Sequence, residues 1–151
     1  MTDTARRILL GIFLIGLAGT SVELLLLGHD EDLNQLIPLI LAGASVVSLG
    51  IVLLAPTGTA IRVFQVVMAP FVVSGALGCV LHFQATVEFQ REMDPSLRGM
   101  ALFQKAIRAK APPTLAPGSM IQLGLIGLAY TFRHRLLDRG RSSDPPARSS
   151  T

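Results

Sequence analysis

Long apolar segments, rather than alternating apolar and polar positions, dominate this chain. Four of them have bounds of about 8–27, 36–55, 60–83 and 115–132. A helix needs roughly 20 apolar residues to cross a hydrocarbon core of about 30 Å. None of the four segments shows the polar stripe with which a helix of a soluble bundle faces water. The pattern therefore predicts an all-α membrane protein built as a four-transmembrane-helix bundle.

The first segment is interpreted as a retained membrane span rather than a signal peptide. The apolar part of a signal peptide has about 7–15 residues and is followed by an A-x-A cleavage site. Residues 8–27 form a longer apolar run, and no such site follows it.

A polar connection, residues 84–114, separates the third and fourth segments. We expect the third helix to continue past His82 to about Met93. Asp94 and Pro95 suit the cap and the first position of a further helix. The apolar residues of that helix fall on one side, and they are Leu97, Met100, Ala101, Phe103 and Ile107. The sequence thus predicts an amphipathic extracytoplasmic helix between the third and fourth spans.

The distribution of positive charge predicts an orientation, because Lys and Arg in short loops mark the cytoplasmic side. Of the 13 Lys and Arg residues, eight lie on the side of the two termini, namely Arg6, Arg7, Arg62, Arg133, Arg135, Arg139, Arg141 and Arg148. The other five lie in the connection 84–114, where Glu88, Glu92 and Asp94 offset them. Both termini are therefore predicted to be cytoplasmic.

The domain organisation follows from these spans. We predict a single transmembrane domain, residues 1–134, and a basic cytoplasmic tail, residues 135–151, that is disordered and contacts anionic lipid head groups rather than nucleic acid. Only 15% of the residues are charged, and the single Cys79 cannot form an internal disulfide. No nucleotide-binding, metalloprotease or serine-hydrolase motif is present, which favours a protein that is not an enzyme.

Histidines and carboxylates gather where the first and third segments end. Glu23 and His29 end the first segment, and His82 ends the third. Glu88 and Glu92, four residues apart, share one face of a helix. Imidazole and carboxylate ligands together suit Zn, Mn or Fe. The sequence thus suggests a divalent-metal site with Glu23, His29, His82, Glu88 and Glu92 as ligands, and, as a lesser alternative, haem between His29 and His82.

Glu23 carries a more specific expectation. A carboxylate within the hydrocarbon region is costly, so such a residue normally faces the interior of the bundle and has a partner there. We therefore expect Glu23 to point inward.

Small residues at close-approach spacing bear on the function. The pairs are Ala44–Ser48, Ser74–Gly78 and Gly124–Gly127. Small residues let helices approach closely in lipid, within one bundle or between subunits. The sequence favours a structural or accessory subunit that contacts the bilayer and other membrane subunits or a second copy of itself. A metal-binding protein is the alternative, and an oligomeric transporter or channel is a lesser one.

Three segments also resemble blocks of a known group. They are "ELLLLGHDED", "HFQATVEFQREMDPSLRGMALF" and "LAPGSMIQLGLIGLAYTFRH". Over about residues 8–134 the chain resembles an uncharacterised family of small bacterial four-helix integral membrane proteins. Asp30 stands where that family often has an aromatic residue, and Gln90 where it has a glutamate. The resemblance implies the four-helix architecture and a bacterial origin, and no particular chemistry. The predicted location is the bacterial cytoplasmic (inner) membrane.

Overall fold

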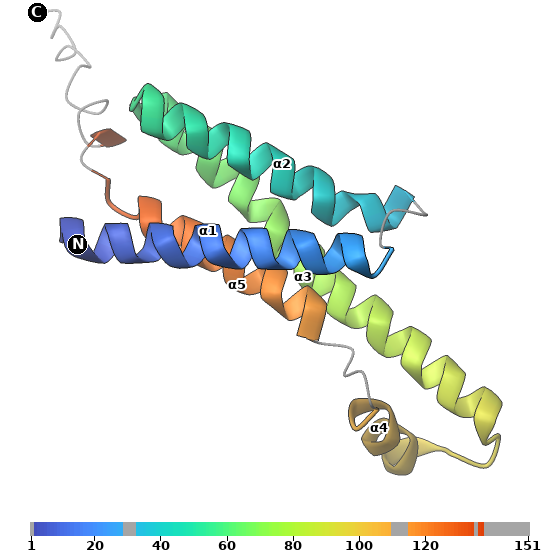
Figure 1. Cartoon of the computed structure of the whole chain (residues 1–151). Helices are drawn as coiled ribbons and strands as arrows, with labels where there is room; N and C mark the ends of the chain where they lie inside the picture. The colour runs from blue at the N-terminus through green and yellow to red at the C-terminus, as the bar shows by residue number, and fades with distance from the viewer. Residues whose placement is uncertain (1, 29–32, 110–114, 135, 138–151) are drawn as a thin grey trace, which may run out of the picture.

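The computed structural model is all-helical and describes residues 2–28, 33–109, 115–134 and 136–137. The predicted loop ligand His29 and most of the predicted tail lie outside these residues. The helices of the described chain, seen in Figure 1, are α1 (Asp3–Leu26), α2 (Leu33–Leu54), α3 (Gly58–Met93), α4 (Gly99–Ile107) and α5 (Leu115–Thr131).

Side-chain caps set where two of the long helices begin. Thr2 Oγ1 accepts a hydrogen bond from the backbone N–H of Ala5 at 3.3 Å, and Thr57 Oγ1 accepts one from Ala60 at 3.0 Å. Each bond satisfies an N–H that has no partner within the helix. Helix α1 therefore starts at Asp3, five residues before the first apolar segment begins at residue 8.

The bundle consists of α1, α2, α5 and the part of α3 before residue 83. Within it, α5 packs along α3 and α1, and α2 packs along α3 (Figure 1). Its centre is aromatic: the rings of Phe13 and Phe64 meet edge to face at 5.8 Å, and those of Phe64 and Tyr130 at 6.4 Å. Such pairs add to the stabilisation from burial alone. Three helices are thereby joined around Phe64, which is fully buried.

Glycines bring α3 and α5 into backbone contact. A Cβ atom on Gly75 would lie 2.7 Å from the backbone oxygen of Pro117, and one on Gly124 would lie 3.0 Å from that of Met68. A Cβ on Gly127 would collide with the Met68 side chain. Of the three predicted small-residue pairs, Gly124–Gly127 thus serves packing within one chain, and Gly78 likewise faces Pro117.

Arg6 joins the beginning of α1 to the end of α5. Its guanidinium donates to the backbone oxygens of Tyr130 at 2.8 Å, Phe132 at 3.1 Å and Arg133 at 3.2 Å. The last carbonyls of a helix have no partner within the helix, and a cation there also interacts favourably with the helix dipole. One side chain therefore satisfies three acceptors and fixes α1 against α5.

The prediction of four transmembrane helices is wrong. Among the described residues, three helices are long and apolar enough to cross a membrane, and their spans are Asp3–Leu26, Gln35–Leu54 and Gly58–Met93. The fourth predicted span forms α5, whose 17 residues extend about 26 Å at 1.5 Å per residue, less than the roughly 30 Å of a hydrocarbon core. Its apolar residues pack on α3 and α1 instead, as buried Met120 and Leu123 show.

The predicted extension of α3 to about Met93 is confirmed. The next helix does not start at Asp94 and Pro95, as predicted, but at Gly99. Asp94 adopts an extended conformation after α3. The Ser96 hydroxyl and backbone N–H both donate to Asp94 Oδ1, at 2.6 and 3.1 Å, and lower the pKa of that carboxyl from its usual value of 3.8. This turn delays the start of α4 to Gly99.

The packed face of α4 also differs from the predicted one. Leu102 and Ala106 are buried, whereas Met100, Phe103 and Ile107 stay exposed. The ring of Phe103 still contacts that of Phe83 on α3 at 5.7 Å. The nine-residue α4 therefore folds back on α3 with Leu102 and Ala106, and its predicted apolar face remains largely uncovered.

Candidate functional site

Glu23 does not point into the bundle, contrary to expectation, but is exposed on α1. The buried positions of α1 include Leu17 and Leu24, and one residue of helix rotates Glu23 by about 100° from Leu24. Glu23 also lies within one turn of the helix end at Leu26. Near the water boundary a carboxylate costs much less than at the membrane centre.

Glu88 and Glu92 share one face of α3, as predicted. With Arg91 they line an open depression that also includes Phe83, Gln84 and Val87. All three charged side chains are exposed. The depression therefore combines two carboxylates with a guanidinium, which is a weaker arrangement for a cation than carboxylates alone.

Four of the five proposed metal ligands lie among the described residues, and these four do not form a metal site by themselves. Among the described residues, no three side chains of His, Cys, Asp or Glu come together in a way that could hold a metal ion. Glu23 and His82 lie on different helices, and His29 falls outside the residues that the structure describes. The metal hypothesis therefore stays a prediction.

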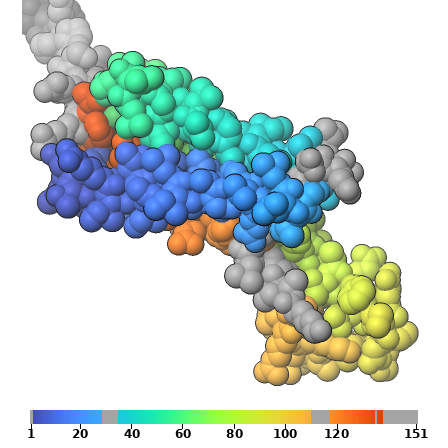
Figure 2. All heavy atoms as spheres, in the orientation of Figure 1, coloured from blue at the N-terminus to red at the C-terminus, as the bar shows by residue number. Residues whose placement is uncertain are grey.

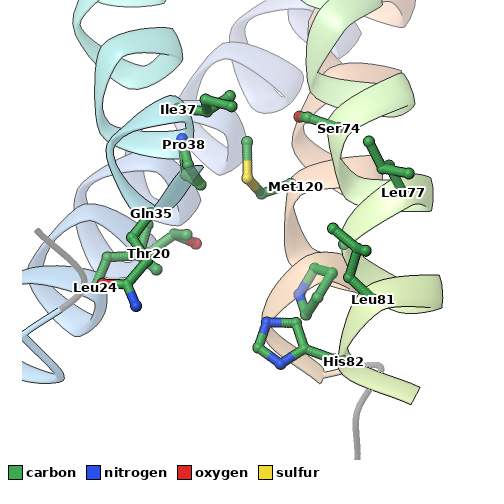
Figure 3. A pocket seen from close by; sticks show the side chains of 12 residues that line it. Thr20, Leu24, Gln35, Ile37, Pro38, Ser74, Leu77, Leu81, His82 and Met120 are labelled. Carbon is green, nitrogen blue, oxygen red and sulfur yellow. The ribbon is translucent and has the colours of Figure 1, made fainter. Parts of the chain in front are cut away.

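His82 instead lines a cavity between α1, α2, α3 and α5. The cavity has a volume of about 310 Å³, within the size range of small-molecule sites. Figure 3 shows its residues, which are Thr20, Leu24, Gln35, Ile37, Pro38, Ser74, Leu77, Gly78, Leu81, His82, Pro117 and Met120. Most of them are apolar, and none of these described residues is Asp, Glu, Lys or Arg.

The polar groups of the cavity lie on two opposite sides. In Figure 3, Thr20 of α1 and Gln35 of α2 face Ser74 and His82 of α3 across the cavity, with Met120 of α5 between them. Ser74 Oγ already donates to the backbone oxygen of Phe71 at 3.3 Å, so it offers only an acceptor. The Thr20 hydroxyl and the Gln35 amide can donate.

Gln35 contains the one buried side-chain polar atom that lacks a hydrogen-bond partner among the described residues, its Oε1. Such an atom costs about 1–3 kcal/mol of stability, so an unsatisfied buried group usually has a specific reason. The terminal torsion of a glutamine amide is broad. A small rotation about it would therefore let the amide meet a group inside the cavity.

Two residues near the start of the second apolar segment lie at this cavity, but the sequence alone does not indicate that they line a site. Gln35 stands just before the second apolar segment, and Pro38 follows three residues later inside α2. Proline removes one backbone hydrogen bond and disturbs the preceding helical turn. Together they mark a polar, irregular helix start, but only the three-dimensional arrangement brings it opposite Ser74 and His82. No family model, curated protein or solved structure matches the chain.

Proposed function

We propose that the protein is an accessory subunit of a membrane assembly, held in the bilayer by its apolar helices. Its three long apolar helices support the membrane location. One observation carries the accessory role. The α3–α4 extension, residues 83–108, projects past the bundle (Figure 2) and exposes large apolar side chains. These are Phe89, Met93, Met100, Phe103 and Ile107.

The length of α3 supports a position outside the hydrocarbon for this extension. Its 36 residues span about 54 Å at 1.5 Å per residue, whereas a hydrocarbon core is about 30 Å thick. Apolar side chains that contact neither lipid tails nor the protein core mark interaction sites. Phe89 and Met93 are 56% and 69% exposed, so this surface has room for a partner.

The charges around the extension favour a protein partner over a lipid surface. A helix that lies on a membrane has a free apolar face and a polar face rich in Lys and Arg. On α4, Leu102 and Ala106 pack against α3 while Met100, Phe103 and Ile107 stay exposed, so the charges decide between the two kinds of partner. Both signs of charge flank the exposed apolar residues, with Arg91 and Glu92 on α3 and Lys105 on α4. Aromatic and methionine side chains among mixed charges are typical of protein interfaces.

We further propose that the protein resides in a bacterial cytoplasmic membrane with both termini in the cytoplasm. The arginine end of the bundle supports this orientation. Arg6 contacts the end of α5 next to Arg133, and a Cβ on Gly58, four residues before Arg62, would lie 2.9 Å from the backbone oxygen of Leu136. These positive residues therefore gather at one end, as cytoplasmic residues do. The resemblance to small bacterial membrane proteins supports the choice of membrane.

Cysteine labelling tests the orientation. In a Cys79→Ala background, Ala55→Cys reports on the arginine end and Leu27→Cys on the opposite end of α1. A maleimide that cannot cross membranes should label Leu27→Cys in spheroplasts and label Ala55→Cys only after the membrane is opened. The reverse pattern would show that the arginine end faces outward and would overturn the proposed orientation.

Mild-detergent purification tests the accessory role. The native protein should migrate as a complex larger than its own 16.1 kDa, with a partner in fixed ratio. A photoreactive residue at Phe89 should crosslink to that same partner. Met100→Glu should release the partner because it places a charge in the apolar contact, and the expected loss is at least tenfold in affinity, as for an interface hot spot.

Gln104→Glu is the matched control, since it adds the same charge at another exposed position of α4. It should leave the complex intact. A lone monomer in mild detergent would contradict the accessory role. Extension-dependent binding to anionic vesicles with no protein crosslink would contradict a protein partner and indicate docking on the bilayer.

A further inference from the structure

We propose that two copies of this chain pair through the outer face of α5, with their Gln122 amides hydrogen-bonded to each other inside the bilayer. This face is separate from the α3–α4 extension, on which the accessory role depends. The inference rests on the membrane location proposed above, which cysteine labelling tests separately.

Gln122 is a polar residue on an otherwise apolar outer surface. Its side chain is exposed on α5 and lines an open depression together with Leu9 of α1. Helices α1 and α5 lie side by side in the bundle (Figure 1). The other residues of the depression belong to α5 and have no polar side chains, and they are Gly118, Ile121, Leu125, Ile126 and Ala129. The depression therefore surrounds one amide with apolar groups.

The packing of its neighbours places Gln122 at mid-depth in the bundle. A Cβ on Gly16, near the middle of α1, would lie 2.9 Å from Cδ2 of Leu123. On the side of α3, a Cβ on Gly124 would lie 3.0 Å from the backbone oxygen of Met68. Gln122 is therefore level with the interior of two helices that are long and apolar enough to cross a membrane.

The exposure of this amide favours a protein partner over lipid. An exposed side chain at this depth faces lipid tails, which can neither donate nor accept hydrogen bonds. A polar group in such surroundings is costly unless it is hydrogen-bonded, and glutamines in membrane bundles bond across helices. Gly118 and Ala129 are small, and small residues let a neighbouring helix approach closely in lipid. The face thus combines an amide that gains from a partner with the space for one.

Symmetry selects a second copy of the chain as this partner. Two copies inserted in the same orientation are related by a two-fold axis along the membrane normal, so each residue meets its counterpart at the same depth. An amide carries both hydrogen-bond donors and an acceptor. Two Gln122 side chains that face each other can therefore form a reciprocal pair of hydrogen bonds.

The spacing of the outer residues suits two α5 helices in contact. Gly118, Gln122, Leu125 and Ala129 follow one another at intervals of four, three and four residues. This is the pattern along the contact line of two helices that cross at about 20°. Leu125 is 54% exposed, so it adds an apolar contact beside the amide pair.

Energy transfer between full chains in vesicles provides the assay. In the Cys79→Ala background, Leu27→Cys is labelled with a donor or an acceptor dye, and the two preparations are mixed in phosphatidylcholine vesicles. Energy transfer should rise with the protein-to-lipid ratio and then saturate. At saturation it should depend linearly on the acceptor fraction, as a dimer requires. A curved dependence would show a larger oligomer and would contradict the two-fold pair.

Two substitutions test the contact, each with a matched control. Gln122→Leu should weaken association about tenfold, because both hydrogen bonds of the pair are lost. Gln84→Leu removes the same amide from an exposed position of the α3–α4 extension and should have no effect. Ala129→Leu should also weaken association about tenfold, because it fills the depression. Ala18→Leu adds the same bulk at an exposed position of α1 and should leave association unchanged.

Crosslinking in native membranes identifies the partner. A photoreactive residue at Leu125 should give a product of twice the 16.1 kDa of one chain. A product with a different protein would show that another subunit covers this face, and crosslinking to lipid alone would show that the face is open to the bilayer. Either result, or unchanged association of Gln122→Leu, overturns the proposal. Met100→Glu should leave the energy transfer unchanged, so a failure of the accessory role is recognised separately.

Discussion

A Gly75→Ala variant is expected to lose about 2 kcal/mol of unfolding free energy, within the range for overpacked cores. The new Cβ would lie 2.7 Å from the Pro117 backbone oxygen and 2.9 Å from the Ile121 backbone nitrogen. Backbone atoms of a helix cannot move aside as a flexible side chain can. The methyl group would therefore force α3 and α5 apart along the most extensive contact of the bundle.

Titration with sodium dodecyl sulfate, followed by circular dichroism, measures this loss. Gly43→Ala is the matched control, because no atom lies within 4 Å of a Cβ at Gly43 on α2. Both substitutions remove a glycine from a helix interior, which by itself favours the helix by roughly 0.5–1 kcal/mol. The control should thus be neutral or stabilised. Equal behaviour of the two variants would show that α3 and α5 do not touch at Gly75.

Arg6→Ala is expected to lower the unfolding free energy by about 1–2 kcal/mol, as partly exposed hydrogen bonds from a charged group are lost. The substitution leaves the backbone oxygens of Tyr130, Phe132 and Arg133 without their donor. Arg6→Lys should recover only part of the loss, because a compact ammonium cannot reach three carbonyls as a planar guanidinium does. The same detergent titration gives the values.

Arg7→Ala is the control for charge. Arg7 is the next residue of α1 and is exposed, so its removal changes the net charge equally. It should leave stability within about 0.5 kcal/mol of the unsubstituted protein, as is usual for surface positions. If both variants lose the same amount, general electrostatics and not the capping of α5 accounts for the effect.

The long apolar segments correctly predicted those helices whose presence follows from local composition alone. The first three segments correspond to α1, α2 and α3, and the polar stretch after His82 was correctly predicted to continue α3. A helix of this kind is recognisable because its length and hydropathy alone decide whether it can cross a bilayer.

The fourth segment was mispredicted because apolar residues look the same whether they face lipid or another helix. Leu123 and Gly124 pack on neighbouring helices, while Leu125 next to them is exposed. Nothing in the sequence of this segment separates the two roles, since its apolar residues show almost no directional bias around the helix. Only the position of Gly75 on α3, against the Pro117 backbone of α5, reveals how closely α5 packs.

The sequence prediction and the structure coincide in the candidate site at one residue. His82 was singled out, and it does line the cavity. Its neighbours across the cavity are Thr20 and Gln35, which are neither charged nor metal ligands in the usual sense. Glu23, chosen for its charge, is exposed on α1 and is not among the residues that line the cavity. The angle of a side chain around its helix depends on packing, so a single glutamate in an apolar run could not be assigned a direction.

The hydrogen bonds between Arg6 and the end of α5 also have a consequence for the order of events during biosynthesis. The acceptor Tyr130 is synthesised 124 positions after Arg6. At a synthesis rate of about 5–20 residues per second, several seconds pass between the synthesis of Arg6 and that of the carbonyls it binds. During that interval anionic phospholipid or water must occupy its donors. The docking of α5 thus replaces these temporary partners and joins α5 to α1.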